Sequence, residues 1–307
     1  MAAVDRSQRE LARNTLAGSM AVGTGVGLMN PLDTLRVRWQ LLDPSSIGSF
    51  RMFFFGILRD EGLWQGLWRH GLTINMMSMA LSGGIRMGTY PYFRDLISEE
   101  KMAWSMFAAG MLGGCVGFSL SAPIFQIKTR SQAEAGVLCP KTGLLLTGAR
   151  RGRRPMYDRG LVSGLIRVAK NEGPLQLWRG GGVLVFRGSL LSAGQQLGYD
   201  GFKTAAKKQG FRDSPVLHLA GAASGAFFAA TFAAPPDVVM TRYQTGPQMG
   251  RVYDGPLGCF RTMIREEGYT VLLRGWMPLF MRLVPLFSVM LPLYEQCRRA
   301  LGMAYLD

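Results

Sequence analysis

Cysteine and histidine are scarce in this sequence, and their spacing excludes most metal-binding and catalytic chemistry. The chain has only 4 Cys and 2 His in 307 residues. The cysteines are far apart and form no Cys-x-x-Cys pair, so neither a zinc site nor a disulfide framework is expected. His70 and His218 have no partner at ligand spacing, and we expect both at interfaces. No nucleophile–base arrangement and no phosphate-binding loop is visible. The sequence therefore predicts no enzyme, no metal site and no cofactor.

Acidic residues are also few, with 20 Asp and Glu against 35 Lys and Arg. The pI of about 10.2 could indicate nucleic-acid binding, so the placement of the charges decides. No basic face interleaved with aromatic residues is visible. Lys and Arg are instead concentrated in every second connection between apolar segments, as in the positive-inside bias of membrane proteins. The first ten residues, MAAVDRSQRE, contain no apolar signal core, so we expect no cleaved presequence.

Long apolar segments rich in glycine are abundant. The chain is 48% hydrophobic and has 40 Gly. Segments of roughly 20 largely apolar residues have the length that crosses a bilayer, and Gly is more frequent in membrane helices than in soluble ones. Small residues at four-residue spacing, such as Gly221 and Gly225, let such helices approach closely. The sequence predicts an all-α membrane protein with six transmembrane helices, at about 14–35, 71–93, 103–127, 181–202, 214–239 and 276–297.

One stretch, PLDTLRVRWQ at residues 31–40, recurs in modified form at Pro123 and Pro235. Each proline is expected to kink or break its helix. Asp33 and Arg36 are three residues apart and therefore share a helical face. Each copy is followed by a Glu-Gly pair and then by an Arg that precedes a span. Such a pattern is an internal repeat, which predicts one domain over 1–307 with repeats 10–98, 102–209 and 212–304.

Each predicted repeat also contains a short amphipathic segment between its two spans. Residues 50–59, 161–170 and 256–266 suit helices that lie along a membrane surface. The longest connection, 133–160, contains the run ARRGRRP. We expect its four arginines in a solvated or lipid-facing loop; they are Arg150, Arg151, Arg153 and Arg154.

These motifs resemble those of the mitochondrial carrier family, and the resemblance covers nearly the whole chain. That family's signature is Pro-x-acid-x-x-base near the end of each odd-numbered helix, followed by Glu-Gly and an aromatic-basic-Gly element. The resemblance implies a pseudo-threefold bundle of six transmembrane helices, formed by three helix–loop–surface helix–helix repeats. It further implies a central substrate site and two rings of ion pairs that open alternately.

The resemblance also implies a location and partners. The protein would be a multi-pass protein of the mitochondrial inner membrane, with the basic connections in the matrix. It would be a monomer, with cardiolipin at the N-termini of the surface helices and a small anionic metabolite as substrate. No nucleic-acid partner is expected.

The ring at the kinks, which the family places at the matrix side, departs from the signature. Phe125 replaces the acid of the second repeat and Met240 replaces the base of the third. In the family, an acid pairs with the base of the next odd helix, so one bridge has lost both partners. Losing one partner would leave a buried charge unpaired, at about 3–5 kcal/mol, whereas replacing both can be neutral. The predicted matrix-gate pairs are Asp33–Lys128, Asp237–Arg36 and the apolar Phe125–Met240.

A second ring is expected at the ends of the even-numbered helices. There the family has aromatic-acid-x-x-base, which is intact after Tyr199 and Tyr294, whereas Pro91 stands in place of the first acid. The predicted residues of this cytoplasmic gate are Arg94, Asp200, Lys203, Glu295 and Arg298.

The expected substrate site lies at mid-membrane on the even-numbered helices. Its positions, aligned on the helix endings, are Ser78, Arg187, Gly188 and Arg282, with Arg86 and Gln195 two turns away. These segments are similar to carriers of the dicarboxylate and oxaloacetate branch. Guanidinium groups bind carboxylates with two parallel hydrogen bonds, which suits a small anion with two negative groups. Arg187 and Arg282 have no acidic partner within their own spans, whose acids Asp200 and Glu295 lie about a dozen residues on at the helix ends. This predicts a compensating anion or a water-filled cavity. The alternative for each Arg is an interhelical tie to backbone carbonyls.

The sequence therefore predicts a secondary transporter that exchanges small anionic metabolites by alternating access. Malate, oxaloacetate and oxoglutarate are the expected substrates, with sulfate and phosphate as further candidates. An uncoupling-type proton or anion carrier is the main alternative. A carrier-fold protein for another substrate class, or one that serves as a binding scaffold, is a further alternative. A nucleotide carrier is disfavoured, because Arg187-Gly188 does not match the residues expected at its contact point.

Overall fold

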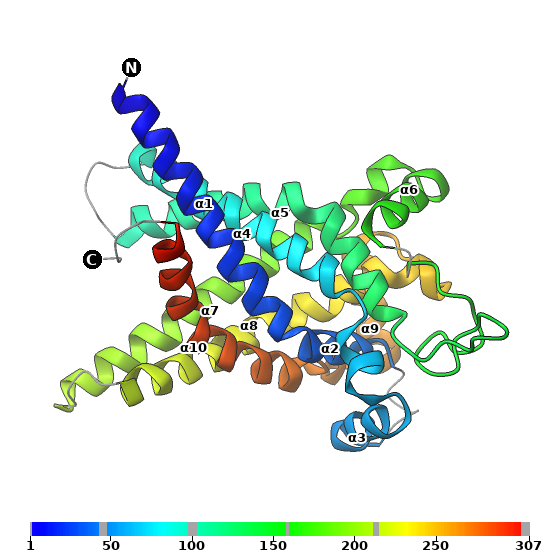
Figure 1. The fold of residues 1–307 in the computed structure, drawn as a ribbon. Coiled ribbons are helices and arrows are strands. Elements are labelled where there is room, and N and C mark those ends of the chain that lie inside the picture. The colour runs from blue at the N-terminus through cyan, green and yellow to red at the C-terminus, as the bar shows by residue number, and fades with distance from the viewer. Residues whose placement is uncertain (1, 43–47, 98–102, 158–159, 211–214, 302–307) are drawn as a thin grey trace.

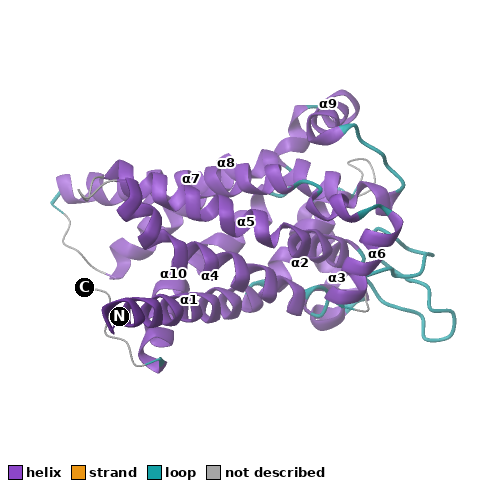
Figure 2. Ribbon diagram, turned by 90° about the horizontal axis from the view of Figure 1, so that it is seen from above, coloured by secondary structure: helices purple, strands orange, loops and turns teal. Residues whose placement is uncertain are grey.

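The computed structural model describes residues 2–42, 48–97, 103–157, 160–210 and 215–301 of the chain. Long helices run through the bundle side by side, and α1 begins and α10 ends at the same end of it (Figures 1 and 2). The short helices α3, α6 and α9 lie at the opposite end. The described part of the chain has no strand, only an isolated bridge between Leu138 and Leu145. The chain is an all-α protein with three repeats of helices.

The three repeats have the same order of elements, and η denotes their short 3₁₀ or π helices. Repeat one has α1 (Ala2–Leu28), α2 (Asn30–Leu41), α3 (Phe50–Asp60), η1 (Trp64–Trp68) and α4 (Leu72–Ile97). Repeat two has α5 (Ala103–Ala133), α6 (Leu161–Asn171), η2 (Pro174–Trp178) and α7 (Gly181–Lys208). Repeat three has α8 (Pro215–Met249), α9 (Gly255–Glu267), η3 (Tyr269–Leu273) and α10 (Trp276–Ala300). The predicted surface helices are confirmed to within a residue at each end.

The prolines act differently in the three repeats. In the first, the helix is interrupted at Met29, two residues before Pro31, and α2 starts afresh. In the second and third, Pro123 and Pro235 lie inside continuous helices. A proline lacks the N–H that would close the preceding turn, so α5 loses one backbone bond at Pro123, whereas α8 contains Pro235, Pro236 and Pro247 and loses one at each.

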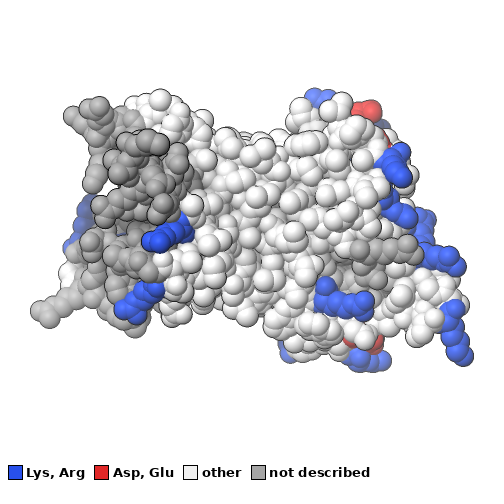
Figure 3. All heavy atoms as spheres, turned by 45° about the horizontal axis from the view of Figure 1, so that its top comes forward, with Lys and Arg blue, Asp and Glu red and all other residues white. Residues whose placement is uncertain are grey.

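Mean hydropathy identifies fewer candidate membrane spans than the six that the sequence analysis predicts. Within the described residues, one segment, Tyr269–Val289, is both long and apolar enough to cross a membrane by that measure. Two of the other long helices bury charged side chains, Lys128 in α5 and Asp237 in α8, and charged residues lower the mean hydropathy of a segment. On the face shown in Figure 3, Lys and Arg gather at the two ends of the molecule and leave an uncharged band between them.

One ion pair recurs inside every repeat and fixes the surface helix to the kinked helix. Each consists of the Arg two positions after the gate base and the Glu of the Glu-Gly pair. Both carboxylate oxygens are engaged in each case, so each pair has the two-pronged geometry that guanidinium favours. The pairs are Arg38–Glu61, Arg130–Glu172 and Arg242–Glu267.

The second and third repeats pack closely through small residues. A Cβ on Gly194 would lie 2.8 Å from the backbone of Ala229, and one on Gly198 would lie 2.6 Å from the Ser224 carbonyl oxygen. Helices α7 and α8 therefore approach with no side chain between them at these points, as the small-residue spacing predicts.

The long connection after α5 is more ordered than a solvated loop, and one prediction about it is wrong. Arg150 is buried and pairs with Glu134. The Glu134 carboxylate also accepts the backbone N–H groups of Met156 and Tyr157, both at 2.8 Å. Burial raises the pKa of this carboxyl above its usual range, and these partners oppose the shift. Arg151, Arg153 and Arg154 are exposed, as predicted.

Candidate functional site: a buried ion cluster at the kinks

Three cations surround Asp33 at the break between α1 and α2. Lys128 Nζ, from α5, lies 2.6 Å from Asp33 Oδ2. Arg36 and Arg282 each place a guanidinium nitrogen 3.1 Å from Oδ1. The Asp33 side chain is fully buried, so these contacts replace its hydration.

Asp237, in α8, has a similar surrounding built from all three repeats. Arg36 and Arg187 both contact its Oδ1, and Gln40 donates to its Oδ2 at 2.7 Å. Arg36 therefore contacts both acids. The cluster is one continuous chain of charges, in which Arg36 links Asp33 to Asp237.

The third interface of the ring is apolar. Phe125 and Met240 are 3% exposed each and share one hydrophobic cluster with Ala122 and Leu184. Phe118 packs on Phe125 with a centroid distance of 5.9 Å. All three contacts expected from the order of the repeats, two ionic and one apolar, are thus present at one depth of the bundle.

The arginines predicted to line a substrate site are occupied by acids in this structure. We expected an anion or a water-filled cavity at Arg187 and Arg282, because neither has an acidic partner within its own span. Arg187 contacts Asp237 and Arg282 contacts Asp33. Each arginine is therefore paired with a kink acid of another repeat in this structure. The partners of Arg187 and Arg282 are carboxylates, not the backbone carbonyls of the alternative prediction.

These two contacts follow one pattern, in which a residue of an even-numbered helix faces the kink position of the next repeat, and the pattern extends to the first repeat. Arg187 on α7 pairs with the kink position of repeat three, and Arg282 on α10 pairs with that of repeat one. The matching position on α4 is Ser78, and the kink position it would face is Phe125. Where the acid is absent, both of its bases, at positions 240 and 78, are absent too.

The cluster carries an excess of positive charge. It contains the cations Arg36, Lys128, Arg187 and Arg282 against the carboxylates Asp33 and Asp237, which leaves two positive charges in excess. All six side chains are at most 5% exposed. Burying unbalanced charge is costly in a low-dielectric surrounding. The cluster therefore buries two positive charges that its own carboxylates do not balance.

The remaining predicted substrate residues differ in their contacts. Ser78 is fully buried and donates to the Asn75 carbonyl at 2.9 Å. A Cβ on Gly188 would lie 2.5 Å from the Phe118 ring, so this glycine permits the packing of α7 on α5. Gln195 is half-buried on α7. Within the described residues, Arg86 on α4 has neither an acid nor a hydrogen-bond acceptor, unlike Arg187 and Arg282.

The predicted cytoplasmic gate is only partly described. Lys203 is half-buried on α7. The side chains of Arg94, Asp200, Glu295 and Arg298 lie outside the described residues, so that ring stays a prediction.

Two sets of residues at the kinks were missed by the sequence analysis. One is the arginine that forms an ion pair with the Glu of each Glu-Gly pair, which is Arg38, Arg130 or Arg242. The other is a glutamine four positions after each gate base, which packs against the glycine at the start of an even helix. Both sets recur at a fixed offset in all three copies, so the repeat itself could have revealed them. The glutamines are Gln40, Gln132 and Gln244.

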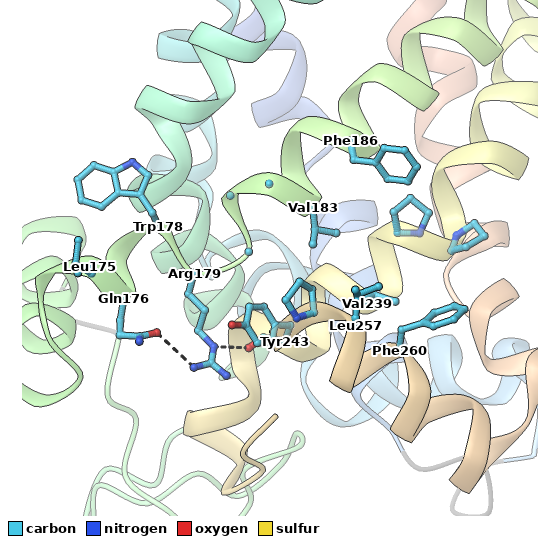
Figure 4. Close-up of a pocket in the computed structure, with 16 residues that line it drawn as sticks. Leu175, Gln176, Trp178, Arg179, Val183, Phe186, Val239, Tyr243, Leu257 and Phe260 are labelled. Atoms are coloured by element: carbon cyan, nitrogen blue, oxygen red, sulfur yellow. Dashed lines mark hydrogen bonds between the residues drawn. The ribbon is translucent and has the colours of Figure 1, made fainter. Parts of the chain in front are cut away.

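A separate pocket of about 710 Å³ opens on the side of the bundle, between the start of α7 and the start of α9. Its walls are mainly apolar and include Trp178, Phe186 and Phe260 (Figure 4). Arg179 lies at its edge, where Nε donates to the Tyr243 carbonyl at 2.9 Å and the guanidinium stacks over the Tyr243 ring.

The fold is a bundle of three helical repeats with a cluster of buried charges at its kinks, an arrangement that fits a solute transporter. The chain belongs to the mitochondrial carrier protein family, whose sequence pattern matches three times, at residues 7–101, 99–210 and 212–304. Members of this family transport small metabolites, and the chain is a transporter rather than an enzyme.

Three relatives illustrate the range of similarity. Mitochondrial uncoupling protein 1 of Arabidopsis thaliana is 28% identical over 97% of this chain and 96% of its own length. A probable mitochondrial 2-oxoglutarate/malate carrier protein of Dictyostelium discoideum is 29% identical over 87% of this chain and 83% of its own. The mitochondrial oxaloacetate transport protein of Saccharomyces cerevisiae is 26% identical over 92% of this chain and 87% of its own.

Proposed function

We propose that this protein exchanges small dianionic metabolites across the mitochondrial inner membrane by alternating access. Dicarboxylates and oxoacids such as malate, oxaloacetate and oxoglutarate are the favoured substrates, and sulfate and phosphate are further candidates. The cluster's excess of two positive charges carries this proposal, because Arg187 and Arg282 add two cations to the kink pairs. The similarity to proteins named as oxoglutarate/malate and oxaloacetate carriers supports the same class.

The substrate would take the place of the protein's own carboxylates. In the described state, Asp237 and Asp33 occupy Arg187 and Arg282. An incoming anion with two carboxylates competes for both guanidinium groups. Once these are taken, each acid loses one cation partner, so the ion pairs that hold the kinks together become weaker. Because a ligand shifts an equilibrium only through its different affinity for the two states, this competition is what couples binding to opening.

Arg86 has a distinct role in this proposal. No acid competes for it among the described residues, so it can accept a substrate carboxylate before any gate contact breaks. Its place on α4, two turns from Ser78, puts it on the expected path towards the site. We propose that Arg86 captures the anion and that Arg187 and Arg282 complete its binding.

The remaining assignments belong to the same proposal. The kink cluster would be the matrix gate, and the ring that includes Lys203 would be the cytoplasmic gate. The chain would act as a single-domain monomer with its basic connections in the matrix. The pocket beside Trp178 and Phe260 would hold an acyl chain of cardiolipin, with the phosphates near the N–H groups that start the surface helix α9, since such helix ends favour anions.

Uptake into proteoliposomes tests the function. Labelled malate, malonate, oxaloacetate, oxoglutarate, sulfate and phosphate are offered to vesicles loaded with each anion in turn, and to empty vesicles as a control. Uptake that requires an internal dianion supports the proposal. Absence of uptake for every dianion, from vesicles whose protein is folded by thermal-shift criteria, rejects it.

An uncoupling-type proton carrier is the second candidate, because the Arabidopsis relative named an uncoupling protein covers 97% of this chain. Proton conductance in vesicles that contain no exchangeable anion separates the two. Conductance without a counter-substrate favours the uncoupling-type function, whereas exchange without conductance favours the metabolite carrier. A carrier for another substrate class would show neither with these anions.

A further inference from the structure

A pair of buried asparagines in the first repeat contacts the ion cluster. Asn30 starts α2 and Asn75 lies one turn before Ser78 on α4, and both are fully buried. Asn75 Nδ2 donates to Asn30 Oδ1 at 2.8 Å and to Asp33 Oδ2 at 3.0 Å. Asp33 Oδ2 is the oxygen that Lys128 also contacts.

Asn30 is held in place by three other segments. Its Nδ2 donates to the carbonyls of Trp68, at 2.7 Å, and His70, at 3.3 Å. Its Oδ1 accepts from Gln132 Nε2 of the second repeat at 3.2 Å, in addition to Asn75. Asn30 therefore fixes the orientation of the Asn75 amide, which in turn directs its N–H to Asp33.

The other two repeats are apolar at the same positions. The residues before the prolines are Ala122 and Ala234, and both are buried. The counterparts of Asn75 are Leu184 and Leu279, as the backbone shows: the N–H groups of residues 75, 184 and 279 donate to the carbonyls of Gly71, Gly180 and Gly275 respectively. An Ala–Leu pair thus fills the space that Asn30 and Asn75 fill in the first repeat.

Packing alone does not account for the asparagines. Asn75 Oδ1 is buried and has no hydrogen-bond partner among the described residues, which destabilises the fold relative to leucine. The contribution of Asn75 is its N–H contact with Asp33. That contact exists in the one repeat whose even helix has Ser78 in place of an arginine.

We propose that Asn75, oriented by Asn30, is a positioning residue of the matrix gate that holds Asp33 against Lys128. Opening of the matrix gate then breaks the Asn75–Asp33 hydrogen bond together with the Asp33–Lys128 ion pair. The inference rests on the proposed role of Asp33 and Lys128 in the gate. A hydrogen bond to a charged group stabilises enough to shift a two-state ratio by about tenfold.

The test uses the double variant Asn30→Ala/Asn75→Leu, which copies the Ala122–Leu184 pair of the second repeat and should therefore fold. The reporter is Val37→Cys in α2, one turn beyond Asp33 and 1% exposed in the closed state. Its rate of reaction with a polar maleimide reports how often the matrix gate opens. Cys259 in α9 stays as the internal standard, because burial raises the pKa of its thiol to about 12 and keeps it unreactive. The other natural cysteines are replaced by serine; they are Cys115, Cys139 and Cys297.

The double variant should raise the Val37→Cys labelling rate several-fold, up to about tenfold, and leave Cys259 unchanged. Thr129→Val is the matched control, since its buried hydroxyl donates to the Phe125 carbonyl of its own helix at 2.9 Å, and it should have no effect. Lys128→Met removes the ion pair itself and should also raise the rate. An unchanged rate in the double variant with a raised rate in Lys128→Met overturns the role of Asn75 and leaves the gate intact. An unchanged rate in both overturns the gate, and faster labelling of Cys259 as well would show general loosening, which also rejects the role.

Discussion

Two sectors of the ring at the kinks hold the helices together by different kinds of contact. Around Asp33 and Asp237 the helices are held by a chain of buried charges that share Arg36. Around Phe125 and Met240 they are held by apolar packing. Apolar contacts are non-directional and weaken gradually with distance, whereas buried ion pairs depend on having every partner in place. The charged sector should therefore be far more sensitive to single substitutions, and in the proposed function it is the sector with which an anion would interact.

The largest effect is expected at Arg36, the residue that links both acids. Arg36→Leu leaves Asp33 and Asp237 short of a partner at once, which should cost about 3–5 kcal/mol of stability and abolish transport. Thermal unfolding in detergent and uptake in proteoliposomes measure the two effects. Arg36→Lys serves as the control that keeps the charge but lacks the fork needed to reach both acids. A stable, active Arg36→Leu protein would contradict the expected greater sensitivity of the charged sector.

The next effect is expected at Arg187 and Arg282. Replacing either by Ala should nearly abolish dicarboxylate transport at matched expression, since the substrate loses a guanidinium and a kink acid loses a partner. Replacing either by Lys should keep the charge but weaken transport, because two-pronged binding is lost. Wild-type rates for both alanine variants would show that the anion binds elsewhere.

A smaller effect is expected when charge is placed in the apolar sector. Phe125→Asp buries a carboxylate beside Leu184 and Phe118, at about 3 kcal/mol, the lower end of the range because Lys128 lies three residues on. Phe125→Asp combined with Met240→Lys restores a pair and should recover much of the stability and transport. If the single and double variants are equally impaired, the two side chains do not interact.

The smallest effect is expected from an exchange of one apolar side chain for another of similar volume. Met240→Leu keeps the volume of the cluster around Phe125 and should change the free energy of unfolding by less than about 1.5 kcal/mol. Transport should stay within twofold of the unmodified protein. A loss as large as that of Arg36→Leu would mean that Met240 contributes more than packing.

Much of this fold could be predicted because it is repeated. The surface helices at 50–60, 161–171 and 255–267 follow from a short amphipathic segment that each repeat contains. The pairing of Asp33 with Lys128 is what the resemblance to the carrier family implied. Repetition also explains why the joint loss at Phe125 and Met240 could be interpreted from sequence.

What could not be predicted depends on geometry that no repeat encodes. Whether Arg282 meets an anion or Asp33 depends on the rotation and depth of α10 relative to α2, and the sequence of α10 contains neither. Arg150 belongs to a run of arginines that is typical of an exposed loop, yet Glu134, sixteen positions earlier, buries it. Asn30 and Asn75 occur in a single repeat, so they had no recurring pattern to reveal them.

The two unbalanced positive charges of the ion cluster have a consequence for how the membrane potential acts on the proposed cycle. Each elementary charge that moves across the membrane gains or loses about 2.3 kcal/mol per 100 mV. A dianion neutralises the excess of the six-residue cluster, so the loaded cluster itself would carry no net charge through the field, and the proposed contact with Arg86 adds one positive charge. A monoanion would leave one positive charge, and a trianion one negative charge, so either would be driven or opposed by the potential. In the proposed cycle, the charge of the cluster would thus determine how strongly the passage of an anion depends on the electrical gradient.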